Sequence, residues 1–581
     1  MHKFDKATIA PLLIFVSVSV ILGTLFTIQY YLPIGAINQA EDLPKILRTI
    51  DKNYIVNDQF INSSSEHFDI RYYYVLIMAE LVSFFGLKTA FLFVCLIVNS
   101  STVFLTGWFA YKLFNKNTLA GLVGCVLTYE TIFTVAGGYS LLTSQVVANS
   151  VSMIFLFLAF YKLIIEKKLI TSSFLLGVGG VIQPLNSIAA FSLCWIGSIF
   201  IDIFGSSSKS EAIKNKIRKY VYSVVAFSIP MAFIIVPYII NSSGKIPDEL
   251  FVNIYGYFRI PHHSMPSYFL RDSIGEILLF IVMIFFILKV SPPILFKRDF
   301  KIFILNLFAM SVAFGFCNYI FVEIIPTRLF TILVPIMKLS PIIAWFGTIV
   351  IAGYISLPAK KIFHFMPLLL IVYYLDFSQH ILILALMYIV NSLFHFSSNF
   401  EKKYETSINL LNIFLLILFV LSYQFNFKNY KISKSFDLQN SVNVITNKIS
   451  SANDDLYSYI EDNTNENAIF IVPHDMQEFR LRTRRAPVAL FKTYPPNDDG
   501  LKEWYTRMND VYTCYNSKVH GINASNYGGK LFYMNYLNVD DDCLKYLSHK
   551  YGANFAVLYN ETVTSAAVLF KNDRYKLVKT F

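Results

Sequence analysis

The amino-acid sequence predicts an all-α polytopic membrane protein with about 13 transmembrane helices, followed by a C-terminal α/β domain on the outer side. Hydrophobic residues make up 55% of the 581 residues and charged residues only 15%, whereas soluble domains carry about 25% charged residues. Many uncharged stretches reach the roughly 20 residues that a helix needs to span a bilayer. After about residue 430 the composition becomes polar, which indicates a separate soluble domain.

The distribution of Lys and Arg orders the predicted spans. The first span, 8–31, follows "MHKFDK" and is too long for a signal peptide, so we expect a retained anchor with a cytoplasmic N-terminus. The others are predicted at 89–114, 118–137, 143–165, 169–200 (two short spans broken at Gln183-Pro184), 220–240, 274–290, 302–322, 329–358, 362–375, 377–396 and 407–425. This order places nearly every basic cluster inside. The net charge of +11 therefore indicates inner loops facing anionic lipid, and no nucleic-acid partner is expected.

The same order defines two domains. Residues 1–428 form the predicted transmembrane domain, with outer loops at 33–88 and 241–272. The apolar stretch 71–87 is short and contains a glutamate, so we expect a helix lying on the membrane surface. Residues 429–581 form the predicted periplasmic or extracellular α/β domain. Its strands are expected at 467–472, 487–492, 554–559, 566–570 and 575–581, and helical patterns such as that of 498–512 lie between them.

Two aspartates of the first outer loop are candidate general bases. Asp42 precedes Leu43-Pro44, which predicts a helix start with Asp42 as its N-cap. Asp58 lies among aromatic and apolar residues that should hold it at the membrane surface. Partial desolvation there would raise the basicity of its carboxylate. A purely structural role explains either aspartate equally well.

The second outer loop contains "FRIPHHSMP", in which two prolines fix the shape around Arg259, His262 and His263. Arg71 and Arg328 are predicted at the same membrane level. Arginine suits phosphate because its planar fork donates two hydrogen bonds. Adjacent histidines point in different directions, so no metal site is predicted; a divalent metal is the less favoured alternative and the cofactor stays unknown. For Arg328, snorkelling to the headgroups is an equally good explanation.

The C-terminal domain contains a run of arginines and two cysteines. The segment "FRLRTRRAP" is predicted to form a solvated face, with binding of phosphate or an anionic glycan as the alternative. Its arginines are Arg480, Arg482, Arg484 and Arg485. Cys514 and Cys543 could form a disulfide in an oxidising compartment, but their spacing alone leaves this open.

The order of these features resembles that of the GT-C glycosyltransferases. The resemblance is carried by the first span, the acidic outer loop, and the segments "RYYYVLIMAELVSFFGL" and "KTAFLFVCLIVNSSTVFLTGWFAYKLF". The chain is also similar to an uncharacterised bacterial multi-pass family with an R-x-P-H-H-x-x-P outer loop, although Gln183-Pro184 stands where that family has a His-Pro pair. The GT-C resemblance implies polyprenyl-phosphate-linked sugar donors and an acidic base in the first outer loop. Asp58 or Asp42 would be that base. The implied ligands of the lipid phosphate are Arg259, His262, His263, Arg328 and Arg71.

The expected function is therefore transfer of a sugar from a polyprenyl-phosphate carrier to an envelope glycan or lipid acceptor, on the outer face of a bacterial inner membrane. A transporter or flippase of lipid-linked saccharide and a non-catalytic envelope scaffold are the alternatives. The sequence contains no GxGxxG, P-loop, HExxH, GxSxG or CxxC motif, so nucleotide-driven transport and soluble-type hydrolysis have no support.

Overall fold

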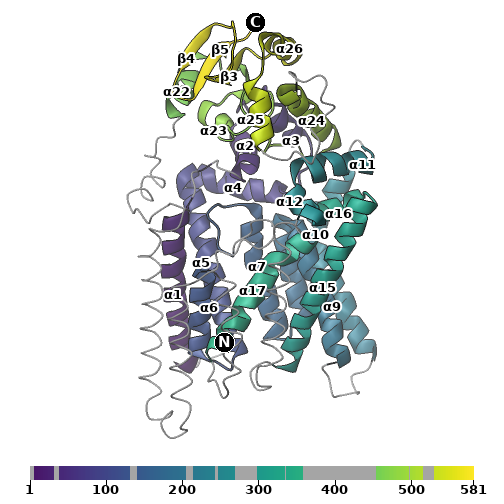
Figure 1. Ribbon diagram of the computed structural model, residues 1–581. Coiled ribbons are helices and arrows are strands. Elements are labelled where there is room, and N and C mark those ends of the chain that lie inside the picture. Colours follow the sequence, from purple (N-terminus) through teal and green to yellow (C-terminus); the bar gives the residue numbers. More distant parts are fainter. Residues whose placement is uncertain are drawn as a thin grey trace, which may run out of the picture.

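The protein consists of a helical bundle with a mixed α/β region stacked on one end (Figure 1). The computed structural model describes residues 6–31, 34, 38–130, 141–204, 213–241, 246–268, 297–333, 335–356, 453–495, 497–513 and 529–581. The predicted spans 274–290, 362–375, 377–396 and 407–425 lie outside these residues, as does the predicted boundary between 428 and 429.

The bundle confirms a multi-pass membrane protein. Its helices are α1 (Lys6–Tyr30), α5 (Leu87–Leu113), α6 (Thr118–Glu130), α7 (Ala148–Ile164), α8 (Leu169–Ile182), α9 (Pro184–Phe204), α10 (Ile213–Asn241), α15 (Arg298–Asn318) with its continuation η2 (Tyr319–Ile324), α16 (Arg328–Leu333) and α17 (Pro335–Ile355). In the described part of the chain, six helical segments are long and apolar enough to cross a membrane: Ile9–Tyr30, Leu87–Leu113, Pro184–Phe204, Asn215–Ile240, Arg298–Ile324 and Arg328–Ile355.

The predicted break at Gln183-Pro184 is confirmed. Helix α8 ends at Ile182 and α9 begins at Pro184, with Gln183 extended between them. Proline disfavours helical geometry in the residue before it and lacks the N–H that would continue the ladder. The 14 residues of α8 extend about 21 Å at about 1.5 Å per residue. Because the hydrocarbon core is about 30 Å thick, α8 does not cross it alone.

Helix α4 (Tyr72–Phe85) lies across the end of the bundle, under the C-terminal region (Figure 1). Gly86 separates it from α5 with a φ of 79°, a left-handed value that glycine adopts without strain. This change of direction keeps the apolar stretch 71–87 from extending α5. The orientation is the one expected of a helix lying on a membrane surface.

Close packing of large and small side chains holds the bundle together. The ring of Trp345 is fully buried, stacks on Phe157 with ring centroids 4.4 Å apart, and donates a hydrogen bond from Nε1 to Thr106 Oγ1 at 2.8 Å. Helices α5 and α6 approach closely at Gly107, where an added Cβ would lie 2.9 Å from the Gly121 carbonyl oxygen. Small residues at such crossings let helices in membranes pack backbone against backbone.

The C-terminal region confirms the predicted α/β class. Its sheet has the order β2-β1-β3-β5-β4, with β1 parallel to β2 and β3, and β5 antiparallel to β3 and β4. The elements are α22 (Asp454–Asn463), β1 (Ile469–Ile471), α23 (Phe479–Thr483), β2 (Ala486–Pro487), α24 (Asp498–Thr513), α25 (Gly529–Leu537), α26 (Asp541–Tyr551), β3 (Phe555–Tyr559), β4 (Val568–Lys571) and β5 (Tyr575–Lys579).

The strand predicted at 487–492 is wrong beyond its first residue. Only Ala486 and Pro487 pair with β1, and the chain then leaves the sheet in a turn. The apolar side chains that suggested a strand, Leu490 and Phe491, are buried in the core instead. This turn carries residues 491–494 toward the outer loops of the bundle.

The second outer loop and the C-terminal region share one hydrophobic core, and residues 54–61 of the first outer loop pack against Ala486 in a smaller cluster. The loops contribute α2 (Gln39–Ile50), α3 (Gln59–Glu66), α11 (Asp248–Phe251), the π-helical η1 (Val252–Arg259) and α12 (Pro261–Ser264). Phe258 of η1 lies among the rings of Phe491, Trp504 and Phe532, with centroids 5.7, 5.7 and 5.9 Å away. The C-terminal region therefore packs directly on the second outer loop.

Candidate functional site

A charged cluster lies where α2, the start of α4, η1 and the turn 491–494 meet. We define the Glu41 cluster as Glu41, Asp42, Arg71, Arg259 and Lys492. Arg71 Nη1 lies 3.0 Å from Glu41 Oε2 and 3.0 Å from Asp42 Oδ1. Arg259 Nη2 lies 2.6 Å from Glu41 Oε1, so Glu41 joins the two arginines. The structure thus brings together three of the predicted site residues, Asp42, Arg71 and Arg259.

Both carboxylates stand in the first turn of α2, where the partial positive charge of a helix start favours anions. The predicted N-cap role of Asp42 is wrong, because α2 begins earlier, at Gln39. The segment Gln145–Val146 fixes that earlier start. Gln145 Oε1 accepts a hydrogen bond from the Asn38 N–H at 3.3 Å, and the Val146 carbonyl accepts one from Gln39 Nε2 at 3.4 Å.

The two carboxylates differ electrostatically. Burial raises the pKa of Asp42 by more than the charges of Arg71 and Lys45 lower it. Burial opposes ionisation of Glu41 as well, but Arg71, Arg259, Lys45 and Lys492 together outweigh it and lower the pKa of Glu41. Adjacent residues of one turn therefore have pKa values displaced in opposite directions, a pattern that occurs at acid–base sites.

Arg259 is held rigidly. Its side chain is almost fully buried, and its guanidinium lies 5.2 and 5.1 Å from the ring centroids of Phe491 and Tyr494. Nη2 also donates to the Lys492 carbonyl oxygen at 3.0 Å. Arginine keeps its charge in such surroundings and stacks on aromatic faces. The turn 491–494 thus fixes the cation beside Glu41.

Lys492 adds a further cation from the C-terminal region. Its charge acts on both Glu41 and Arg259. Burial and the Arg259 charge lower the pKa of the Lys492 ammonium, while Glu41 opposes the shift. Phosphate oxygens are good partners for such a cluster of Arg and Lys side chains.

Asp58 lies in a second buried ion pair and not in the Glu41 cluster. It is the N-cap of α3, accepting from the Ile61 N–H at 2.9 Å, and its Oδ2 lies 2.6 Å from Arg480 Nε. Arg480 also donates from Nη1 to Thr493 Oγ1 at 2.5 Å. The pair links residues 422 positions apart in the sequence. Its geometry is that of a tie between the first outer loop and the C-terminal region.

The prediction of a solvated arginine face is wrong for Arg480 and Arg485, which are both 3% exposed. Arg485 donates to the carbonyl oxygens of Thr483, Glu461 and Thr464 at 3.0, 2.9 and 2.7 Å, so it closes the end of α22 against β2. Arg484, in contrast, is exposed, with 70% of its side chain accessible. Arg480 lies within α23, and Arg484 follows its end as a C-cap with a left-handed backbone, φ 53°.

The remaining predicted ligands lie elsewhere around the second outer loop. Arg328 forms an ion pair with Asp498 of α24, and its guanidinium lies 4.3 Å from the Phe251 ring centroid. His262 and His263 are in α12, directly after η1. His263 is half-buried, and the side chain of His262 lies outside the described residues.

No group of three His, Cys, Asp or Glu side chains within the described ranges is arranged to hold a metal ion. Gln183, the residue before Pro184, is buried and is the C-cap residue of α8. The disulfide that the sequence left open between Cys514 and Cys543 involves Cys514, which lies outside the described residues.

Comparison with known proteins agrees with this architecture. The model of a domain of unknown function, DUF6798, matches residues 452–511, a segment that includes Arg480 and Lys492. No curated protein matches the sequence. ArnT from Cupriavidus metallidurans, solved bound to undecaprenyl phosphate, is similar in structure with a TM-score of 0.50 and 11% identity, over 98% of this chain and 97% of that chain. The chain has a GT-C fold.

Two solved structures of the Archaeoglobus fulgidus oligosaccharyltransferase are more distantly similar. The apo form has a TM-score of 0.40 and 10% identity, over 96% of this chain and 70% of that chain. The complex of AglB with an inhibitory peptide and a dolichol-phosphate has a TM-score of 0.39 and 10% identity, over 95% and 69%. The similarity to ArnT confirms the GT-C fold expected from the sequence, and the relationship with the uncharacterised bacterial family stays a prediction.

Sequence reasoning missed Glu41 and Lys492 as members of the site in this GT-C fold. For Glu41 a signal was present, because the adjacent acidic pair Glu41-Asp42 opens an outer-loop helix. For Lys492 the local sequence "PVALFK" indicated only a strand. Its place beside Glu41 depends on the turn after β2 and on the packing of the C-terminal region onto η1.

Proposed function

We propose that the protein is an integral membrane glycosyltransferase that transfers a sugar from a polyprenyl-phosphate carrier to an envelope glycan or lipid acceptor. The Glu41 cluster carries this proposal, since it joins two carboxylates to three cations at one end of an apolar bundle with a GT-C fold. ArnT, whose structure contains undecaprenyl phosphate, is similar over nearly its whole length, which supports a lipid of that class as the donor.

The proposed reaction requires one base and several cations. The acceptor hydroxyl oxygen forms a bond to the anomeric carbon of the sugar, and its proton passes to the base. The bond from that carbon to the phosphate oxygen breaks, and the polyprenyl phosphate leaves with the electron pair. Cations near the phosphate stabilise the charge that develops on it.

Asp42 fits the role of base best. Its raised pKa makes it a better proton acceptor than an ordinary aspartate, and Oδ2 forms no hydrogen bond within the described structure, while Oδ1 is held by Arg71. Asp58 fits less well because Arg480 and the α3 N–H groups occupy its carboxylate. In this proposal Arg259, Lys492 and Arg71 bind the lipid phosphate, and Glu41 positions the two arginines.

The other expected ligands have supporting roles in the proposal. His262 and His263 follow Arg259 closely and could donate to the phosphate, whereas Arg328 ties α16 to Asp498. We place the cluster on the outer face of a bacterial inner membrane, because the positive-inside rule puts both loops there. The R-x-P-H-H-x-x-P loop supports a relationship with the uncharacterised bacterial family.

Mass spectrometry of envelope glycans and lipids tests the function. A strain lacking this gene should lose one sugar modification, and the wild-type gene should restore it. The purified protein should consume a polyprenyl-phosphate-linked sugar when supplied with extracted acceptor. Unchanged envelope spectra together with no donor consumption would contradict the proposal. Restoration of the envelope without any transfer by the purified protein would favour a flippase.

The proposed roles of Asp42 and Lys492 predict a bell-shaped pH dependence. Activity should rise as the pH passes through the pKa of Asp42, which lies above the usual 3.8, because the base must be ionised. It should fall as the pH passes through the pKa of Lys492, which lies below the usual 10.5, because the ammonium is then lost. Lys492→Arg keeps the charge and should move the alkaline limb to higher pH without moving the acidic limb.

The pH–rate profile of purified enzyme measures this. Lys502→Arg, at an exposed position of α24, is the matched control and should leave both limbs in place. If the alkaline limb lay at the same pH in the wild type and in Lys492→Arg, Lys492 would not belong to the site.

A further inference from the structure

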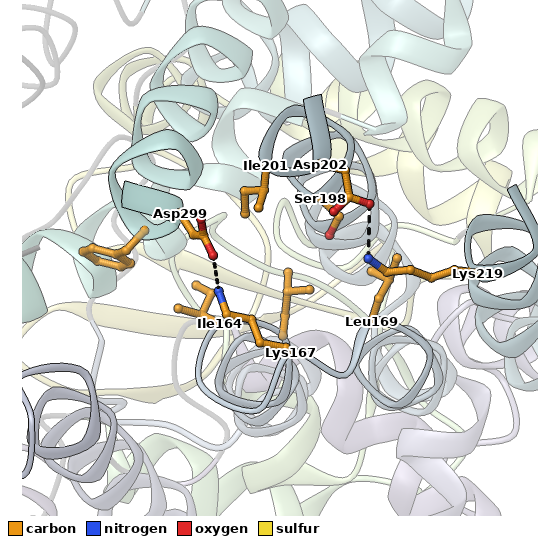
Figure 2. Close-up of a pocket in the computed structure, with 10 residues that line it drawn as sticks. Ile164, Lys167, Leu169, Ser198, Ile201, Asp202, Lys219 and Asp299 are labelled. Atoms are coloured by element: carbon orange, nitrogen blue, oxygen red, sulfur yellow. Dashed lines mark hydrogen bonds and ion pairs between the residues drawn. The ribbon is translucent and has the colours of Figure 1, made fainter. Parts of the chain in front are cut away.

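A polar pocket lies at the end of the bundle farthest from the C-terminal region (Figure 2). No step of the proposed transfer uses it. Its volume is about 240 Å³. The end of α7, the starts of α8, α10 and α15, and the last turns of α9 surround it. Five helices separated in sequence therefore converge on one concave site.

Two ion pairs stand on opposite sides of this pocket, with Ser198 and Ile201 between them (Figure 2). Lys167 Nζ lies 2.8 Å from Asp299 Oδ2, and Lys219 Nζ lies 3.3 Å from Asp202 Oδ2. The pocket therefore presents two ammonium groups and two carboxylates, which sum to zero charge.

Both ion pairs are open to exchange with a ligand. The side chains of Lys167 and Lys219 are 55% and 38% exposed, and exposed pairs contribute little to stability. The floor beneath them is apolar and buried, formed in part by Leu169 and Phe300. Ser198 Oγ donates to the Cys194 carbonyl at 2.7 Å, which leaves its oxygen as an acceptor.

The pocket lies at the level of lipid headgroups. The apolar span of α9 ends at Phe204, and those of α10 and α15 begin at Asn215 and Arg298, so three span ends meet here. Charged side chains at span ends lie in the headgroup region. Ile203 and Ile217, close in sequence to Asp202 and Lys219, are exposed apolar side chains that could contact acyl chains.

We propose that this pocket binds the headgroup of a zwitterionic phospholipid that carries a phosphate and a primary ammonium, the phosphoethanolamine class. The phosphate would replace the carboxylates as the partner of Lys167 and Lys219. The ammonium would then pair with the carboxylates so released and with Ser198. A net-neutral pocket matches a net-neutral headgroup, whereas an anionic headgroup would add negative charge beside the two carboxylates, of which, among the described residues, only Asp202 has a further donor, the Tyr220 hydroxyl at 2.6 Å. A quaternary ammonium has no N–H group that could donate a hydrogen bond to these oxygens.

The test uses full-length protein purified in detergent and stripped of lipid, with thermal unfolding followed by tryptophan fluorescence. Short-chain phosphatidylethanolamine should raise Tm in a saturable manner. Its half-saturating concentration should be on the order of tenfold lower than those of phosphatidylcholine and phosphatidylglycerol of the same chain length. Inorganic phosphate alone should have no comparable effect. An equal response to all three lipids, or to phosphate alone, would overturn the proposal.

Two variants at the pocket sharpen the result. Lys219→Gln removes a phosphate partner, and Ile201→Trp fills the space between the ion pairs while leaving their charges in place. Each variant should raise the half-saturating concentration of phosphatidylethanolamine on the order of tenfold. The Tm shift of each variant is measured from its own lipid-free Tm. Lys168→Gln is the matched control, because that exposed lysine pairs with Glu166 outside the pocket. Retention of the full response in both pocket variants would also overturn the proposal.

Discussion

Replacing Asp42 with asparagine is expected to lower the rate of sugar transfer by about 10²- to 10⁴-fold, the usual contribution of a positioned general base. Asparagine has nearly the same shape and still offers an oxygen to Arg71, which now holds Asp42 Oδ1 at 3.0 Å. The amide cannot take the acceptor proton. The loss should therefore appear in kcat, with little change in the binding of the lipid donor.

Transfer by purified protein, with donor consumption measured over time, checks this result. The matched control is Glu66→Gln, which changes an exposed carboxylate of the same outer loop and should leave the rate unchanged. The Tm of each variant shows whether the fold is retained. If the Asp42→Asn protein were folded and transferred sugar at the wild-type rate, Asp42 would not be the general base. If Asp58→Asn instead abolished transfer without lowering Tm, the base would be Asp58.

The second large effect concerns the buried ion pair between Asp58 and Arg480. Arg480→Met should lower the free energy of unfolding by about 3–5 kcal/mol, because it leaves the Asp58 carboxylate buried without its partner. Asp58→Asn should also destabilise, although asparagine is as good an N-cap for α3 as aspartate. The double variant should lose less than the sum of the two single losses, because it leaves no unpaired charge.

Thermal and denaturant unfolding of the purified variants measure these losses. Arg484→Met is the control, since that side chain is 70% exposed and its loss should cost less than about 0.5 kcal/mol. Limited proteolysis should cut Arg480→Met faster within the C-terminal region than it cuts the control. Strict additivity of Asp58→Asn and Arg480→Met would show that the two charges do not stabilise one another.

The ion pair also affects the site. Arg480 holds Thr493 through its hydroxyl, and Arg259 holds the carbonyl of the preceding residue, Lys492. The turn 491–494 is thus fixed on one side by Arg480, which pairs with Asp58 of the first outer loop, and on the other by Arg259 of the second. Loss of Arg480 should therefore weaken the phosphate-binding geometry as well as the fold.

Membrane character was predictable because it depends on features local to the chain, whereas the GT-C fold was expected only from a resemblance to known enzymes. Length and apolarity identify the spans, basic clusters order them, and the proline at 184 ends α8 wherever the bundle places it. Likewise the short runs with aromatic and β-branched residues at β3 and β5 predicted those strands. Such features act through the backbone and the solvent, so neighbouring residues suffice to show them.

The composition of the site was only partly predictable. The sequence indicated Asp42 and Arg71 of the first outer loop and Arg259 of the second as candidates, but it ranked Asp58 with Asp42 and interpreted Arg480 as a surface residue. Tertiary structure decided otherwise by placing Asp58 and Arg480 together inside a shared core.

Local pattern therefore determined that this is a multi-pass membrane protein with acidic and basic outer loops. Tertiary structure alone decided which carboxylates meet which cations. Charge pairing depends on distance in space, and residues as remote in sequence as Asp58 and Arg480 approach each other only when the C-terminal region packs on the outer loops. The same packing brings Lys492 to Glu41 and buries Asp42, which raises its pKa.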